Sequence, residues 1–513
     1  MKKTALLSAI ILIIFSLSLI KCNSNNSNDS KESVAVSKTF IQATISDNEF
    51  TYVPIDSALF EGPGVIQNWV DNFNDSAIEE HAWKLWGGLT ALTNQVYPVT
   101  DTAKKYNLPQ VNLPVFSTWW DEYETFSPPA ADLPRSMMRL HAPRQVSSVA
   151  GDVSPSTHGG DVLSFNKYNQ EYLDYIRRHE FYYLRAFTDL YKSKTTHVPQ
   201  DFEPKKTMML KPSFIIASST VPVLVPYWKG PSMTIDGTTD TLHPISSTWL
   251  QWVLFNPTSQ SIPAGTAFTT SYSDTHGNIR DTTLTSYEIV GRDYFYHLSL
   301  TPADVSYIRS GNIFTIGGLT PDSIKTGDLA LLVACHVTTI EFFGDWTWQT
   351  FWWSPHPAKT PPASANVRGP FTHYDMMPAY YMTGKDGQPV ISQNPYLEPG
   401  IIAPIIAYPW PPADRNFSKG VGARSNCMSC HHSAAFPSAN LDPNPGHMLI
   451  ASYIGAGNVT ENDPIFHKTS MNPRVNTNFL WTPILMKQAT FAPNGKDSLQ
   501  IYLSQKSSTL KKQ

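Results

Sequence analysis

The sequence predicts a mixed α+β protein, in which a helix-containing N-terminal region precedes a β-rich body folded as a sandwich or a partly closed barrel. Three observations predict this class. The clearest helix patterns lie before residue 200, and short apolar or alternating runs dominate after residue 211. The chain also holds 41 prolines in 513 residues, about 8% where about 5% is usual. Frequent prolines favour short strands and ordered loops over a helical bundle.

The N-terminal helices are predicted from capping and periodicity. Residues 76–88 begin with the capping-box pattern Ser76-Ala77-Ile78-Glu79 and reach Gly87-Gly88, where glycines are expected to end the helix. Residues 169–191 carry an aromatic stripe at three- and four-residue intervals, which predicts a second helix with a core-facing side.

The β-rich body is predicted from a series of runs bounded by Gly, Pro, Asn and Asp: residues 213–218, 221–227, 248–255, 267–272, 286–298 and 329–340. The last run contains Cys335, which we interpret as a buried strand thiol. Residues 345–353 then hold four tryptophans, and strand alternation places Trp346, Trp348 and Trp352 on one face. That face is interpreted as core, with a ligand-stacking platform or a cofactor wall as the alternatives. Residues 355–415 are expected to be loop-like because they are rich in proline.

Composition and charge exclude two classes of protein. Hydrophobic residues make up 41% of the chain and charged residues 16%, unlike a disordered protein. The 38 basic and 42 acidic residues give a net charge of −4. A nucleic-acid-binding protein generally carries a basic surplus, so we expect no nucleic-acid partner.

The N-terminus has the pattern of an export signal. Positive Lys2 and Lys3 precede an uncharged apolar run that ends at Ile20. Residues 1–21 are therefore predicted to be a signal peptide that directs the rest of the chain out of the cytoplasm.

The residues after this run resemble the start of a bacterial lipoprotein. The resemblance implies that Cys22 becomes the lipidated first residue and that polar residues 22–45 form a tether to the membrane. Lys21 departs from the pattern, because the residue before the lipidated cysteine is normally small. Ordinary cleavage near Ser16-Leu17-Ser18 and an uncleaved anchor remain alternatives.

A Cys-X-X-Cys-His motif carries the strongest chemical signal. Cys427-Met428-Ser429-Cys430-His431 is the attachment signature of c-type haem. The two thiols bond the vinyl groups of one porphyrin, and the histidine is the proximal iron ligand. With four Cys and 15 His in the chain, composition alone gives such a match roughly 0.001 times. The sequence therefore predicts one covalent haem c, bound by Cys427, Cys430 and His431.

Two other uses of the cysteine pair are weaker. A thioredoxin-like dithiol follows a strand, but residues 414–425 are rich in Gly, Asn, Ser and Arg and have no strand pattern. A zinc site needs two further ligands at finger-like spacing; His432 and His447 are present, but a second cysteine pair is not.

The sixth iron position decides what a haem here would do. Met471, 40 residues beyond His431 in a turn-like Ser-Met-Asn-Pro context, is the first candidate for a distal ligand. Met486, a histidine such as His447 or His432, and no protein ligand at all remain alternatives. A filled position makes an electron carrier, whereas an open one permits oxidase or peroxidase-like chemistry.

Together these patterns divide the chain into successive regions: signal peptide 1–21, tether 22–45, helix-containing region 46–200, β-rich region 201–365, Pro-rich connection 366–420 and haem region 421–513. The chain resembles exported bacterial mono-haem c-type cytochromes with one Cys-X-X-Cys-His near the C-terminus of a large Trp-rich body. The resemblance is carried by residues 427–431, 346–353 and 478–481. It implies a cytochrome c-like fold for the haem region.

The resemblance also implies electron transfer in the cell envelope to or from an unidentified redox partner protein. The chain would be lipid-anchored to a membrane and would face the periplasm or the cell surface. Two alternatives remain open. The first is a haem enzyme with an open distal site lined from residues 355–415. The second is a ligand-binding lipoprotein in which haem has a structural or sensing role. A two-haem peroxidase is disfavoured because the chain has one attachment motif.

The motif makes a direct prediction. Cys430→Ala should abolish the haem that stays with the polypeptide through denaturing electrophoresis, because one thioether bond is lost. Haem staining of the gel, with Cys335→Ala as a cysteine control outside the motif, measures this. Unchanged staining of the Cys430 variant would contradict the assignment.

Overall fold

The structure is a computed structural model, and the parts it describes belong to one compact unit, Phe40–Gln513. It describes residues 50–126, 128–129, 163–195, 197–202, 206–228, 230, 233–235, 238–240, 251–273, 279–310, 319, 321–342, 345–381, 384–385, 390, 392, 394, 396–397, 428, 431, 435–436 and 475–477.

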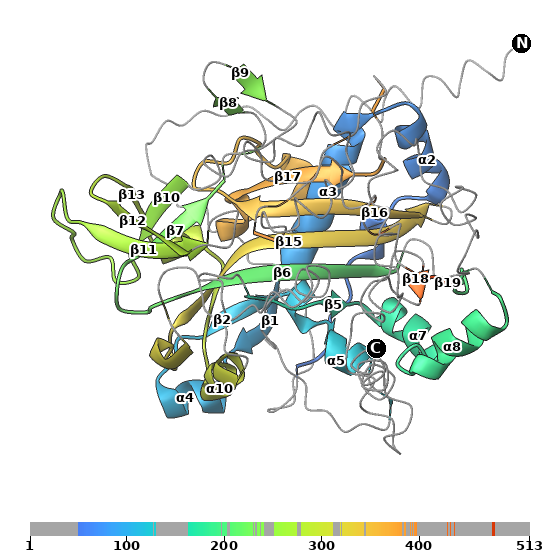
Figure 1. Ribbon diagram of the computed structural model, residues 1–513, viewed down its shortest axis with the longest axis horizontal. Coiled ribbons are helices and arrows are strands. Elements are labelled where there is room, and N and C mark those ends of the chain that lie inside the picture. Colours follow the sequence, from blue (N-terminus) through green and yellow to red (C-terminus); the bar gives the residue numbers. More distant parts are fainter. Residues whose placement is uncertain are drawn as a thin grey trace, which may run out of the picture. The chain divides into compact units, whose positions relative to one another are not determined.

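An eight-stranded antiparallel sheet is the centre of this unit (Figure 1). Its main path runs β17-β16-β15-β6-β5-β3, while β14 pairs with β15 and β4 with β6. The strands are β3 (Trp120–Asp121), β4 (Leu163–Ser164), β5 (Lys167–Tyr168), β6 (Met208–Ala217), β14 (His297–Ser299), β15 (Leu329–Phe342), β16 (Asp345–Trp353) and β17 (Tyr374–Ala379).

A three-stranded sheet contains β7 (Val223–Tyr227), β10 (Gln251–Phe255) and β13 (Glu288–Val290); β10 is antiparallel to β7 and parallel to β13. Four two-stranded pairs complete the described strands. They are β1 (Leu92–Tyr97) with β2 (Val111–Pro114), β8 (Met233–Ile235) with β9 (Thr238–Asp240), β11 (Phe268–Ser273) with β12 (Ile279–Leu284), and β18 (Ala435–Phe436) with β19 (Val475–Asn476). The mixed α+β class is thus confirmed, and none of the described sheets closes into a barrel.

The described α-helices are α2 (Pro63–Asp71), α3 (Asp75–Thr90), α4 (Thr100–Tyr106), α5 (Glu122–Thr125), α7 (Gln170–Arg178), α8 (Leu184–Lys192) and α10 (Pro302–Ser310). Helix α3 confirms the helix predicted at 76–88, but its ends differ from the prediction. Asn74 caps it, accepting a hydrogen bond from the backbone N–H of Ala77, and it continues past both glycines to Thr90. Short 3-10 turns occur at Ser57–Leu59, Val115–Thr118, Arg292–Tyr294, Pro321–Ser323, Ala363–Ala365 and Gly369–Thr372.

The single helix predicted at 169–191 is wrong, because the structure has two helices there. Asn169 caps α7 by accepting from the N–H of Tyr172 at 3.2 Å. The chain then turns through Glu180, which has a φ of +53°, before α8 begins at Leu184. A left-handed residue cannot continue an α-helix, so one periodic stripe is divided between two elements.

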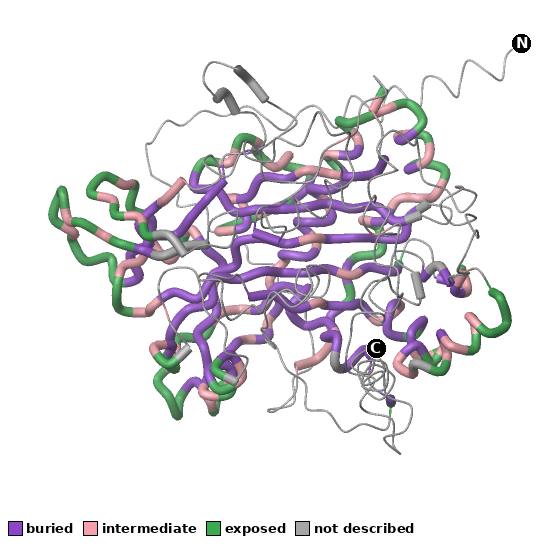
Figure 2. The backbone as a smooth tube through the Cα atoms, in the orientation of Figure 1, coloured by how far each residue is buried: buried purple, intermediate pink, exposed green. Residues whose placement is uncertain are grey.

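Most predicted strands are present. The six runs correspond to β6, β7, β10, β11, β15 and, for residues 286–298, the separate strands β13 and β14. The loop-like prediction for 355–415 is wrong at β17, where Tyr374–Ala379 adds an edge strand to the large sheet. Figure 2 shows the strands of this sheet buried along most of their length, with exposed residues concentrated on β11, β12 and the outer helices.

Gly87 allows α3 to approach the chain segment beside it. A Cβ atom at this position would lie 1.7 Å from the backbone oxygen of Ala365. The glycine predicted to end the helix therefore serves close packing in its interior.

Gly87→Ala should lower the free energy of unfolding by about 1–3 kcal/mol or more, because backbone must move to accept the methyl group. Gly64→Ala is the matched control: Gly64 lies in the first turn of α2 with nothing within 4 Å of an added Cβ. That change should leave stability unchanged or raise it by up to about 1 kcal/mol. Equal urea midpoints for the two variants would contradict the packing argument.

Candidate functional site

The central sheet has two faces with different partners. Helix α3 covers one of them, which we call the helix face; Phe351 of β16 stacks there on Trp86 of α3 with ring centroids 4.3 Å apart. The neighbouring residues of β16 point to the opposite side, because strand side chains alternate. We call that side the tryptophan face; it carries Trp346, Trp348 and Trp352 of β16.

The tryptophans are buried, which confirms their interpretation as core. Trp346 is 1% exposed, and Trp348 and Trp352 are each 2% exposed. Trp346 packs beside Phe202, at a centroid distance of 5.5 Å, within an aromatic cluster that includes residues of α7 and α8. Trp352 lies 4.8 Å from Trp228.

Part of the Cys-X-X-Cys-His segment lies on the tryptophan face. The ring of His431 is 4.9 Å from that of Trp348, with the two planes tilted by 44°. Met428, inside the motif, is 1% exposed and belongs to the same cluster as Trp346 and Trp348. The structure therefore brings the predicted proximal histidine to the strand that the sequence singled out for its tryptophans.

Other predicted site residues lie outside the described residues: Cys22, Cys427, Cys430 and Met471. A second described piece of the C-terminal region nevertheless reaches the same cluster. Val475, four residues after Met471 in sequence, is fully buried there, and its strand β19 pairs with β18.

His336 of β15 is a residue that sequence reasoning missed. Register places it opposite Thr350 of β16 and Lys211 of β6, so it projects from the tryptophan face. Burial lowers the pKa of His336 well below its usual value, and the charges of Lys211 and His431 lower it further. His336 is thus a neutral imidazole at neutral pH. Within the apolar run of residues 329–340 it had the pattern of an ordinary core position.

These groups fit the donor chemistry of a haem site. Neutral imidazole nitrogen is a common axial ligand of haem iron, and aromatic walls exclude water from a porphyrin. In the described part of the chain, no group of three or more His, Cys, Asp or Glu side chains could hold a bare metal ion.

The helix face holds a closed polar network instead. His81 of α3 lies 3.1 Å from Glu341 through Nε2 and 2.6 Å from the Tyr380 hydroxyl through Nδ1. Gln349 Nε2 donates to the same hydroxyl at 2.7 Å, and the N–H of Glu61 donates to Glu341 at 2.6 Å. Burial and the charge of Glu341 raise the pKa of Tyr380 well above its usual value. The network is buried, and its members contact chiefly one another, which favours a structural role.

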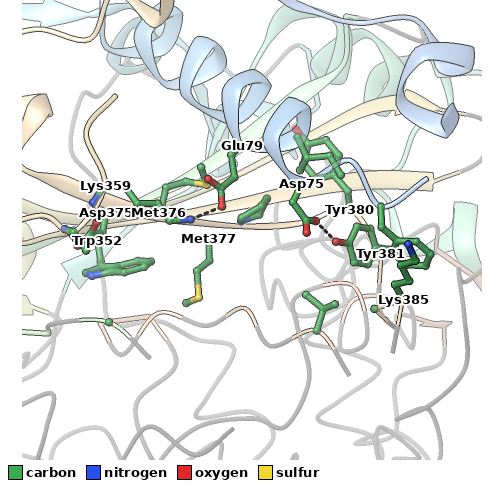
Figure 3. A pocket seen from close by; sticks show the side chains of 17 residues that line it. Asp75, Glu79, Trp352, Lys359, Asp375, Met376, Met377, Tyr380, Tyr381 and Lys385 are labelled. Atoms are coloured by element: carbon green, nitrogen blue, oxygen red, sulfur yellow. Dashed lines mark hydrogen bonds and ion pairs between the residues drawn. The ribbon is translucent and has the colours of Figure 1, made fainter. Parts of the chain in front are cut away.

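A cavity of about 750 Å³ lies beside the edge strand β17 (Figure 3). Two of its charged groups are paired: Lys359 with Glu79, and Asp75 with the Tyr381 hydroxyl. Asp375 accepts hydrogen bonds from the backbone N–H groups of Ala358 and Lys359, both at 2.9 Å, while burial raises its pKa. Trp352, Met376 and Met377 add apolar surface.

No protein-family model matches the chain, and no curated protein or solved structure matches it. Among the helices that the structure describes, none is both long and apolar enough to cross a membrane. Function therefore has to be argued from the residues themselves.

Two adjacent tyrosines give a test of the buried network. Tyr380 and Tyr381 both line the cavity, and Figure 3 shows the Tyr381 hydroxyl joined to Asp75 of α3. The Tyr380 hydroxyl instead meets His81 and Gln349. Tyr380→Phe should cost about 1–3 kcal/mol of unfolding free energy, because it removes the hydroxyl shared by buried His81 and Gln349. Tyr381→Phe should cost less than about 1 kcal/mol, because water can solvate exposed Asp75. Urea unfolding measures both, and the reverse order would contradict the network.

Proposed function

We propose that this protein is a membrane-tethered c-type cytochrome that transfers electrons in the cell envelope. Cys427 and Cys430 would hold one covalent haem, and His431 would be its proximal ligand. The tether would start at a lipidated Cys22. The observation that carries the proposal is the position of His431: the motif histidine lies against Trp348, on a face rich in aromatic rings.

The surroundings of His431 suit a covalently held porphyrin. Met428 is buried in the cluster on the tryptophan face, so the side chain between the two cysteines anchors the motif to the sheet. A low-dielectric wall of aromatic rings beside His431 would disfavour added charge on a haem and so tune its redox potential. When bound, haem supplies one-electron chemistry.

The proposal includes the C-terminal region and the connection that precedes it. Residues 421–513 would form a small cytochrome c-like haem region, with 366–420 as its connection to the body. Met428 and Val475 support this, because these widely separated positions of the C-terminal region belong to one buried cluster with the sheet. The redox partner would be another protein of the cell envelope.

The cavity beside β17 favours a second candidate function, a haem enzyme of the oxidase or peroxidase class. It is lined by residues of the segment 355–415, the segment from which an open distal site was expected. Met377 lines it and pairs with Thr350 on the tryptophan face. A substrate there would lie on the side of β16 away from β15.

Carbon monoxide distinguishes the two functions. The absorption spectrum of the purified, dithionite-reduced protein should be of the c type and should not change when CO is added, because an electron carrier has both axial positions filled. A spectrum that CO shifts would favour the enzyme. Absence of a haem spectrum after expression with the haem-attachment machinery would contradict both functions.

A further inference from the structure

The cavity beside β17 has an apolar middle between two charged ends. Figure 3 shows Lys359 and Asp375 at one end and Lys385 at the other, with Met377 between them. Apolar side chains of intermediate exposure line this middle: Phe73, Met377 and Val390. Their surface is therefore open to a ligand. The volume of about 750 Å³ lies within the range of pockets that hold small molecules.

The acidic groups of the lining already have hydrogen-bond donors. The Glu79 carboxylate pairs with Lys359, and Asp75 accepts from the Tyr381 hydroxyl. Asp375 accepts two backbone N–H bonds, one on each carboxylate oxygen, both at 2.9 Å. A cationic ligand would have to compete with these donors, so the cavity is poorly suited to a positive charge.

Lys385 has the remaining charge of the lining. Its side chain is exposed, and it forms no hydrogen bond or ion pair with the described part of the chain. The ammonium group therefore offers one positive charge to a ligand. A carboxylate balances it with one negative charge, whereas a phosphomonoester carries about −1.5 to −2 at neutral pH. Charge complementarity thus favours a carboxylic acid.

We propose that this cavity binds a fatty-acid-type amphiphile, with its carboxylate at Lys385 and its acyl chain lying along β17 past Met377 toward Trp352. Gly230 helps to close the far end, since a Cβ atom there would lie 3.9 Å from the Trp352 ring. The methionine side chain is flexible and adapts to chains of different shape. The site uses no residue of the Cys-X-X-Cys-His motif, so it does not depend on the c-type haem assignment.

Three ligands that share one ten-carbon chain test the charge of the site. Isothermal titration calorimetry of the full-length protein compares decanoate, decanol and decylammonium. Decanoate should bind saturably and more tightly than the other two, because its head group alone complements Lys385. Tighter binding of decylammonium, or no saturable binding of decanoate, overturns the proposal.

Two variants locate the head group and the chain. Lys385→Gln should weaken decanoate binding about fivefold and leave decanol binding unchanged, because one exposed charge pair is lost. Lys104→Gln is the matched control, since Lys104 is an exposed lysine of α4 outside the cavity. Met377→Trp should weaken both ligands by filling the apolar middle, and its urea midpoint shows whether it folds normally.

The proposal is overturned if the Lys385 and Lys104 variants bind decanoate equally tightly. It is also overturned if a normally folded Met377→Trp protein binds decanoate as the wild type does, because the acyl chain would then lie elsewhere.

Discussion

The pairing of β15 with β6 on one edge and β16 on the other is the constraint on which the rest of the structure depends. Residues 334–339 of β15 pair with strands on both edges, and residues 329–335 are fully buried. A strand that is hydrogen-bonded on both edges and apolar on both faces is stable only when other elements cover each face. Helix α3 covers one face. Aromatic residues near α7 and α8, together with Met428 and Val475, cover part of the other.

The histidines on the two faces of the sheet have different surroundings. On the helix face, His81 contacts Glu341 through Nε2 and the Tyr380 hydroxyl through Nδ1. Both ring nitrogens therefore have partners within the fold. The histidines of the tryptophan face come from distant parts of the sequence and lie among aromatic rings.

Periodicity and local motifs allowed much of this to be predicted. Helix α3 and the strands β6, β10, β15 and β16 were found because each keeps one pattern over its length. The predictions that were wrong or missing concern features that depend on tertiary contacts. β17 contains Pro378, which an edge strand tolerates because one of its edges has no partner to lose. The break at Glu180 interrupts no hydrophobic stripe. His336 could be found only from the register of β15 with β16, which no local pattern contains.

The buried network around His81 can form only after most of the chain has been synthesised. His81 is separated from Tyr380 by 299 residues, and its other partner, Glu341, also lies far along the chain. Contacts of such long range form slowly and leave apolar surface uncovered while the chain is incomplete. Because synthesis proceeds from the N-terminus, α3 emerges with Trp83 and Trp86 long before the sheet that will bury them. A helper that shields this helix, or a delay in folding until β17 has emerged, would therefore protect the nascent chain from aggregation.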